Sequence, residues 1–276
     1  MKFFPAVITT LFLVGCNKFD TQISSPTLSQ LPADIELRAT SDLTAPAPIK
    51  QISFVPNNVA SWLGHIIMVD EYGDLHRATT NSKVIPIQKG DYADVIGLDR
   101  PNKAGAFLAM NRNGTLRAFI EADNEGNFKS IPLSAPNTAI KSFCQANSAY
   151  ENRLWARTDN GTPAAFDIEF IDESGAMLTH VPEAESDEAC TPLTIKAGGA
   201  ALSVKQNSPF LHFGDKNAEM VNGLSIQGLA TPSYATLTHV NMGSVFADGV
   251  LIAADSETGR LILIARSYLL DVLGEP

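Results

Sequence analysis

The chain has 276 residues, 30 of them acidic and 20 basic, so its formal net charge at pH 7 is −10. Nucleic acid and anionic membrane faces attract clustered Lys and Arg, and the acidic balance excludes both as broad docking surfaces. We interpret the negative charge mainly as a source of solubility rather than as an acidic docking site.

The amino terminus, MKFFPAVITTLFLVGC, has the layout of a bacterial export signal. Lys2 precedes a run from Phe3 to Val14 that is apolar apart from two threonines. An apolar run of about a dozen residues suits a secretory signal, whereas a helix that crosses a bilayer needs about 20. We therefore predict a cleaved signal rather than a permanent membrane span.

The end of this run, Leu13-Val14-Gly15-Cys16, resembles the lipobox of bacterial lipoprotein precursors. The resemblance implies a signal peptide over residues 1–15 and lipid attachment at Cys16, with acyl chains such as palmitate. Two or more acyl chains anchor a protein stably to a membrane. Asn17 follows where an Asp would imply inner-membrane retention, so the resemblance favours the outer membrane, facing the periplasm. An ordinary secretory signal with a chance cysteine is the alternative.

Two cysteines remain, Cys144 and Cys190. An even pair in an oxidising compartment predicts a disulfide. The closed loop would hold about 47 residues and contribute roughly 4 kcal/mol in the chain-entropy model. Two buried free thiols are the alternative. No CxxC or His/Cys spacing suggests a zinc site.

Residues 16–33 are rich in Ser, Thr, Gln and Pro, which predicts a flexible tether. Asp34–Arg38 alternates polar and apolar residues and predicts one short strand. A second proline-rich stretch, LTAPAPI, covers residues 43–49.

After residue 50, short apolar runs separated by Gly, Asn and Asp turns predict an all-β domain. Five segments repeat as strand, turn and strand: HIIMVD-EYG-DLHRATT, AFLAMN-RNG-TLRAFIE, RLWART-DNG-TPAAFDIEF, ALSVKQ-NS-PFLHFG and VLIAAD-SETG-RLILIA. Their turns fall at Gly73, Gly114, Gly161, Ser208 and Gly259. Glycine or asparagine in such a turn supplies the positive φ that a tight hairpin needs.

Another predicted strand precedes each hairpin, at residues 49–55, 93–99, 139–146, 192–197 and 237–247. A further strand follows several of the hairpins, as at residues 83–88, 128–133 and 176–182. Four antiparallel strands per unit of about 40 to 50 residues are typical of a β-propeller blade. The last unit, Val245–Leu263, resembles a blade of the WD40 or PQQ-like type.

The resemblance implies a single β-propeller domain over residues 34–276, with five four-stranded blades. The fifth unit has three strands and ends at Ser267–Pro276 without a fourth. We expect Asp34–Arg38 to complete the last blade, so that the tether leaves from the seam between the last and first blades. A β-sandwich or an irregular barrel is the alternative fold.

Candidate catalytic and metal-binding residues are scattered along the chain. The five histidines, His65, His76, His180, His212 and His239, share no metal-ligand spacing, and we predict hydrogen-bonded structural roles. The carboxylates with nominal positions for glycoside hydrolysis are Asp94, Asp99, Asp167 and Glu169. Asp215, Asn217 and Glu219 could supply oxygen ligands to calcium, but a solvated turn is preferred. We predict no catalytic residue, metal or cofactor.

Two tryptophans remain as ligand-stacking candidates. Trp155 lies in the middle of a predicted strand, where packing between blades is expected, and Trp62 lies in a turn that exposure would suit. Packing is the more general role of such residues.

Two functions fit these observations. The first is a lipid-anchored envelope protein that binds another envelope protein through its propeller. It is similar in architecture and anchoring to the propeller lipoproteins of outer-membrane protein assembly, which have eight blades, too many for this chain. The second is a carbohydrate-active hydrolase on a five-bladed propeller.

Overall fold

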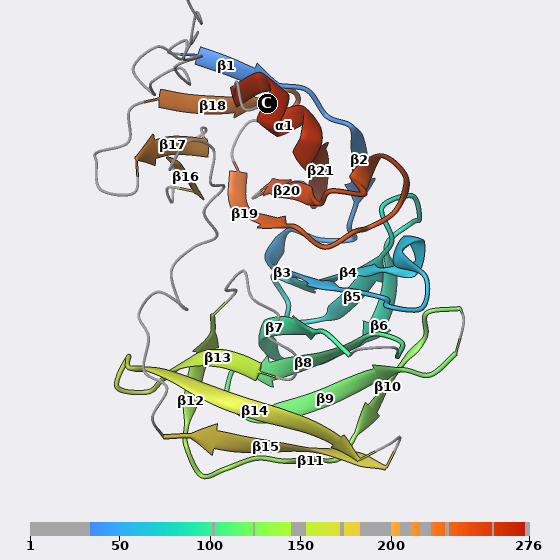
Figure 1. Cartoon of the computed structure of the whole chain (residues 1–276), viewed down its shortest axis with the longest axis vertical. Coiled ribbons are helices and arrows are strands. Elements are labelled where there is room, and N and C mark those ends of the chain that lie inside the picture. Colours follow the sequence, from blue (N-terminus) through green and yellow to red (C-terminus); the bar gives the residue numbers. More distant parts are fainter. Residues whose placement is uncertain are drawn as a thin grey trace, which may run out of the picture.

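A computed structural model describes residues 34–100, 103–123, 125–144, 153–171, 174–182, 200–204, 211–215, 222–229, 232–255 and 257–273. The predicted signal peptide, the tether, Cys16, Cys190 and Ser208 lie outside these residues. The described chain forms five sheets that follow one another around the molecule (Figure 1). The chain is thus the predicted all-β propeller with five blades.

The first three blades are consecutive in sequence. Blade 1 is the sheet β3 (Ile49–Val55), β4 (His65–Asp70), β5 (Leu75–Ala78) and β6 (Ile85–Gln88). Blade 2 is the sheet β7 (Tyr92–Leu98), β8 (Ala106–Asn111), β9 (Leu116–Glu121) and β10 (Phe128–Ile131). Blade 3 consists of β12 (Ile140–Phe143), β13 (Arg153–Thr158), β14 (Pro163–Ile171) and β15 (Gly175–Val181), with β11 (Leu133–Ser134) parallel to β15.

The last two blades each take one strand from the amino-terminal segment. Blade 4 consists of β16 (Ala200–Val204), β17 (Leu211–Asp215), β18 (Asn222–Ile226) and β1 (Asp34–Leu37). Blade 5 consists of β19 (Pro232–Thr238), β20 (Val250–Asp255), β21 (Arg260–Ala265) and β2 (Ser41–Thr44). The predicted first strand of the fourth unit, residues 192–197, lies outside the described residues.

Closure of the last blade by an amino-terminal strand is confirmed, but the strand differs from the predicted one. β1 lies parallel to β18 in blade 4, with Asp34 opposite Gly223. The antiparallel partner of β21 is β2, with Thr44 opposite Arg260. The described chain therefore begins in blade 4 and not at the predicted seam. Leu37, fully buried against the core of blades 4 and 5, favours this placement of β1.

The hairpins that carry the sequence repeat are confirmed. Gly73, Gly114, Gly161 and Gly259 all have positive φ, between 67° and 91°. In the first three blades the turn glycine N–H donates to the carbonyl three residues earlier, as from Gly73 to Asp70 at 3.1 Å. The same hydrogen-bonded turn therefore recurs at the same position of the first three hairpins.

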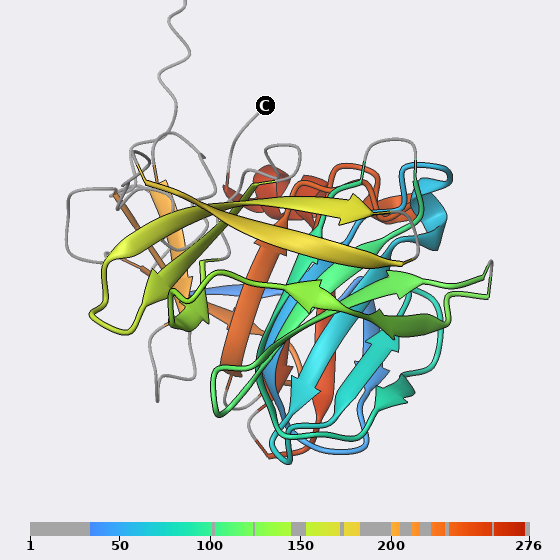
Figure 2. The same ribbon diagram turned by 90° about the horizontal axis from the view of Figure 1, so that it is seen from below.

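The core lies between neighbouring blades, and the second strands of blades 1, 2 and 5 are buried on both faces. In β4, Ile66 and Met68 pack toward blade 5, while Ile67 and Val69 pack toward Phe107 of blade 2. Strands buried on both faces have continuous apolar sequences instead of alternating ones, which explains runs such as HIIMV. Figure 2 shows the strands of blades 1 and 5 running between the same two ends of the molecule.

Two elements of the carboxyl-terminal part differ from the prediction. The strand predicted over residues 237–247 is instead β19, which ends at Thr238, followed by the 3-10 helix η4 (Ser244–Phe246). After β21 the chain forms the helix α1 (Arg266–Leu273), whose Leu269 is fully buried in the core of blades 4 and 5. Among the described residues, no helix is long and apolar enough to span a membrane.

Candidate functional site

Asp94 is a buried carboxylate on β7, the first strand of blade 2. Its Oδ2 accepts a 2.7 Å hydrogen bond from Phe143 N on β12 of blade 3, and its Oδ1 accepts one from Val95 N. Burial raises the pKa of Asp94 to about 6, although the two backbone donors act to lower it. Its contacts are structural, since they hold the inner strands of two blades together.

The other three nominated carboxylates have separate surroundings. Asp99 follows β7 and accepts a hydrogen bond from Asn58 Nδ2. Asp167 lies on β14, the third strand of blade 3, and pairs with Arg153 at 2.8 Å on an exposed face. Glu169 lies two residues further along β14. Glycoside hydrolysis needs two carboxyl groups that flank one bond. Asp94 and Asp99 belong to β7 and the residue after it, Asp167 and Glu169 share β14 of another blade, and Asp94, Asp99 and Asp167 each have a separate partner.

Two of the five histidines are paired with buried carboxylates. His76 Nε2 lies 2.9 Å from Asp70 Oδ2, and His65 Nε2 lies 3.2 Å from Glu121 Oε1. The predicted structural, hydrogen-bonded role is confirmed for both. His180 lies on β15 and His212 on β17, while His239 follows β19. The described residues contain no group of three or more His, Cys, Asp or Glu side chains placed to hold a metal ion.

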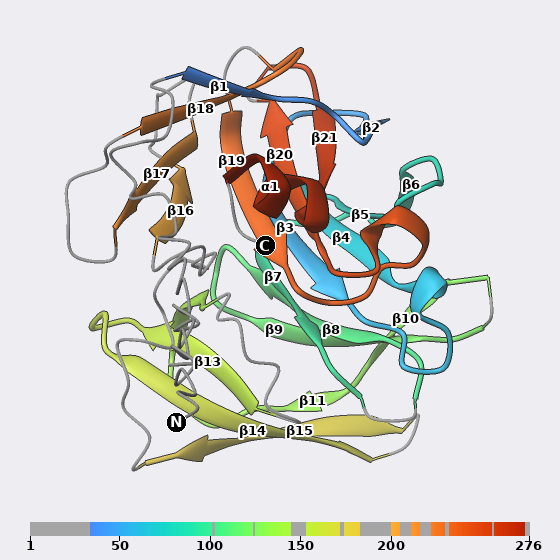
Figure 3. The ribbon, with the colours of Figure 1, turned by 45° about the horizontal axis from the view of Figure 1, so that its top comes forward.

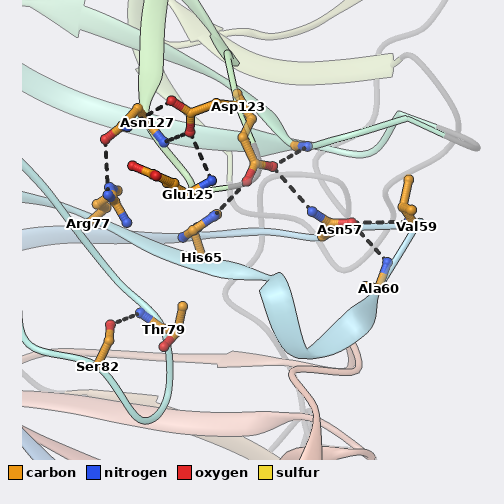
Figure 4. Close-up of polar contacts among 12 residues, drawn as sticks. Asn57, Val59, Ala60, His65, Arg77, Thr79, Ser82, Asp123, Glu125 and Asn127 are labelled. Carbon is orange, nitrogen blue, oxygen red and sulfur yellow. Dashed lines mark hydrogen bonds and ion pairs between the residues drawn. The ribbon is translucent and has the colours of Figure 1, made fainter.

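Glu121 joins blade 2 to blade 1 through hydrogen bonds with His65 and Asn57. Figure 4 labels these two partners. Its Oε1 accepts from His65, and its Oε2 accepts at 3.2 Å from both Asn57 Nδ2 and Gly105 N. The side chains of His65 and Glu121 are only 4% and 3% exposed. Because a carboxylate can only accept, Nε2 of His65 carries the proton of this hydrogen bond.

Further polar contacts surround this pair. Arg77 Nη2 donates at 3.2 Å to Asn127 Oδ1, and Asn127 Nδ2 donates at 2.8 Å to Asp123 Oδ2. The hydrogen bonds from Asn127 lower the pKa of Asp123. A Cβ atom at Gly126 would lie 2.5 Å from the His65 ring and 3.0 Å from Arg77, so this turn packs closely on both side chains. These contacts therefore hold His65 and Arg77 of blade 1 against blade 2.

Asn57 connects the hydrogen bonds around Glu121 to the loop after β3. Its Oδ1 accepts hydrogen bonds from Val59 N at 3.1 Å and from Ala60 N at 3.0 Å. Such an Asx turn gives the backbone a defined bend. The 3-10 helix η2 (Ser61–Leu63) follows directly. A buried carboxylate of blade 2 thus fixes the start of a surface loop of blade 1.

The loop presents apolar side chains to solvent. Val59 is 72% exposed, Trp62 is 68% exposed, and Val245 of η4 is 58% exposed. The turn before η4 lies against η2, since a Cβ atom at Gly243 would lie 2.7 Å from Trp62 Cα and Cβ. Figure 3 shows the two turns, cyan for η2 and orange-red for η4, at the same end of the molecule. We call Val59, Trp62 and Val245 the Trp62 patch.

The two segments that carry the Trp62 patch are uncharged in sequence, although Asp99 accepts a hydrogen bond from Asn58 of the first segment. Residues 56–64, PNNVASWLG, and residues 240–247, VNMGSVFA, contain no Asp, Glu, Lys or Arg, although the whole chain carries a net charge of −10. Aromatic side chains are enriched in the cores of protein interfaces, where charged residues are depleted. The composition of the patch therefore matches an interface core more closely than a solvated face.

The remaining candidates fall in ordinary places. Trp155 lies half-buried in the middle of β13, opposite Ala165 of β14, so the predicted packing position fits. Cys144 is buried at the end of β12, where its N–H donates to Trp155 O. Because Cys190 lies outside the described residues, the Cys144–Cys190 disulfide stays a prediction. Asp215 ends β17, whereas Asn217 and Glu219, of the segment predicted to be a solvated turn, lie outside the described residues.

Sequence reasoning named Trp62 as a candidate and raised its exposure as an alternative to the preferred packing role, but it missed Glu121 and Asn57. Glu121 is a lone carboxylate at the end of the strand LRAFIE, and Asn57 is one of two asparagines after Pro56. The two residues are 64 positions apart in the chain. Only the placement of β9 beside the first blade brings them together.

Comparison with known proteins adds general likeness only. No family model and no curated protein sequence matches the chain. Among solved structures, a chain in an S. cerevisiae complex of Dbp5 with Nup159 and Gle1 aligns at 11% identity and a TM-score of 0.32, over 79% of this chain and 65% of that one. Chaetomium thermophilum Raptor aligns at 9% identity and 0.43, over 82% and 29%.

The β-propeller domain of Cps50 (Swd1) from Myceliophteria thermophila aligns at 11% identity and a TM-score of 0.35, over 79% of this chain and 83% of that domain. This chain covers 65% of the chain in the Dbp5 complex and 29% of Raptor, which is less than two thirds of the length of each. The assignment of the fold depends on the five sheets described above and not on these alignments.

Proposed function

We propose that this chain is a lipid-anchored protein of the bacterial cell envelope that binds another envelope protein through the Trp62 patch. The observation that carries the proposal is a solvent-exposed, uncharged apolar group on a loop held in place by buried hydrogen bonds. The lipobox ending at Cys16 supports the anchor, and Asn17 in place of an Asp supports the outer membrane as its site.

A protein partner is supported on two physical grounds: the apolar surface that it would bury and the order of the loop before binding. Exposed Trp and Val side chains gain about 25 cal/mol for each Å² of apolar surface that a partner removes from water. A loop that is already ordered pays little conformational entropy on binding. Trp is also enriched among the few interface residues that dominate affinity.

The test uses Trp62→Ala in the full-length tagged lipoprotein, recovered from crosslinked membranes. Tyr72→Ala is the matched control, because Tyr72 is an aromatic residue with the same 68% exposure on the β4–β5 turn. We expect one envelope protein to be recovered with the wild type and the Tyr72 variant, and its affinity to fall at least tenfold with Trp62→Ala. Equal recovery with Trp62→Ala, or recovery of no envelope protein at all, would contradict the proposal.

The anchor has its own test. In the wild type, metabolic labelling with palmitate and mass spectrometry should find acyl chains on the residue at position 16 and no residues before it. Cys16→Ser should abolish both labelling and membrane association. Label that persists in Cys16→Ser would show acylation at another residue and contradict attachment at Cys16. An unlabelled wild type cleaved elsewhere would show an ordinary secretory signal instead.

A further inference from the structure

We propose that Glu121 is a positioning residue for the Trp62 patch, acting from blade 2 on a loop of blade 1 through Asn57. The inference rests on the proposed function only for the statement that the patch binds a partner. The positioning itself follows from the hydrogen bonds around the Glu121 carboxylate.

Three donors from separate parts of the chain meet this carboxylate. His65 begins β4, Asn57 follows β3, and Gly105 precedes β8. Hydrogen bonds to an ionised acceptor are stronger than those between neutral groups. The Glu121 side chain is almost completely buried, so water does not compete freely for these donors. Glu121 is thus the common acceptor that holds Asn57 in one orientation.

The orientation of Asn57 decides the shape of the loop. While Nδ2 donates to Glu121, Oδ1 faces the N–H groups of Val59 and Ala60 and accepts from both. If the Asn57 amide rotated by half a turn, Nδ2 and Oδ1 would exchange places. The N–H groups of Val59 and Ala60 would then face an NH₂ group, which cannot accept from them. The turn would then lose its hydrogen bonds, and Trp62 two residues further on would become mobile. Affinity for a partner would fall because the loop must be ordered again on binding.

The experiment uses a Trp155→Phe background, in which Trp62 is the single remaining tryptophan. Its fluorescence anisotropy and its quenching by acrylamide report the mobility of the loop without any partner. In Glu121→Gln, one carboxylate oxygen is replaced by an NH₂ group that cannot accept from Asn57 or Gly105. We expect lower anisotropy, and affinity for the partner reduced about tenfold.

A second variant separates positioning from general damage. Glu121→Gln combined with Asn57→Asp restores the contact with its polarity reversed, because the new amide donates to the new carboxylate. The carboxylate still accepts from Val59 N and Ala60 N. We expect the anisotropy of Trp62 and the affinity to return toward wild-type values, even if Gly105 N remains unpaired and the free energy of unfolding stays reduced.

Unchanged anisotropy in Glu121→Gln would overturn the inference, and so would an anisotropy as low in the double variant as in the single one. If Glu121→Gln does not fold, Asn57→Ala removes the same link while His65 keeps its partner, and normal anisotropy there would overturn the inference equally. A change in anisotropy with no partner bound by any form would support the positioning role while contradicting the proposed function.

Discussion

Asp94 should give the stability of the protein a specific pH dependence. Its pKa is about 6 in the folded protein and 3.8 as an ordinary carboxyl group. Between these values the folded protein binds a proton at Asp94 that the unfolded chain has released. The free energy of unfolding therefore falls as pH rises through this range. At 1.36 kcal/mol per pKa unit, the total fall that Asp94 contributes is about 3 kcal/mol.

The comparison of wild type with Asp94→Asn isolates this contribution. The amide cannot accept from both Phe143 N and Val95 N, so the variant carries a cost that is the same at every pH. Urea unfolding of both proteins from about pH 4 to about pH 7 should show the variant gaining about 2.4 kcal/mol relative to wild type as pH rises, because the rest of the total change falls outside this range. A stability difference that stays constant across the range would refute the reasoning.

Three further substitutions test the packing of the blades, each by urea unfolding. Gly161→Ala meets no atom within 4 Å and should cost only the strain of its positive φ, about 1 kcal/mol. Gly73→Ala has the same turn geometry but brings Cβ to 2.9 Å from Tyr92 N, so its cost should be larger by at least another 1 kcal/mol; equal costs would contradict this packing. Gly97→Ala places Cβ 1.8 Å from Phe54 O and should cost about 3 kcal/mol or prevent folding. A Gly97→Ala protein with wild-type stability would show that β3 and β7 do not approach so closely.

The hairpins could be predicted because their information is local. A turn such as Arg112-Asn113-Gly114 fixes both the bend and the register of the strands on either side, and no distant residue is needed. The separations of these turns then gave the number of units. For the same reason the bounds of β4, β8, β13 and β20 coincide with the predicted strands.

The closure of the ring could be predicted only in outline. Asp34–Leu37 and Ser41–Thr44 are strands of four residues, too short for a period to select their partners. Pro46 makes the segment around β2 resemble a loop in the sequence. Proline beyond the end of an edge strand, however, costs no ladder hydrogen bond. The residue that secures β2 is Arg260, which donates to Asp42 and to Gly228 O of the neighbouring blade. These contacts join residues more than 200 positions apart as well as adjacent blades.

In the candidate site, too, local features can be read from the sequence, whereas contacts between blades cannot. The turn position of Trp62 makes exposure an alternative, but packing, the more general role of tryptophan, is the preferred prediction, and the 68% exposure of Trp62 differs from it. The roles of Glu121 and Asn57 could not be predicted, since a glutamate at a strand end and an asparagine after a proline are each ordinary when seen alone. Their meaning comes from the contact between blades, which is set by the packing of Val55, Val69 and Phe107.

The position of β1 bears on how an anchored domain would present the Trp62 patch. The predicted tether, residues 16–33, would span at most about 60 Å when extended, and about 25 Å on average as a flexible chain. It joins the domain at Asp34 on blade 4, whereas the patch lies where blades 1 and 5 meet. A flexible chain of this length transmits no torque, so the lipid on Cys16 would set the concentration of the domain near the membrane but not its orientation. The orientation of the bound domain would then be decided by the partner, and shortening the tether should weaken binding only when the remaining length can no longer span the gap.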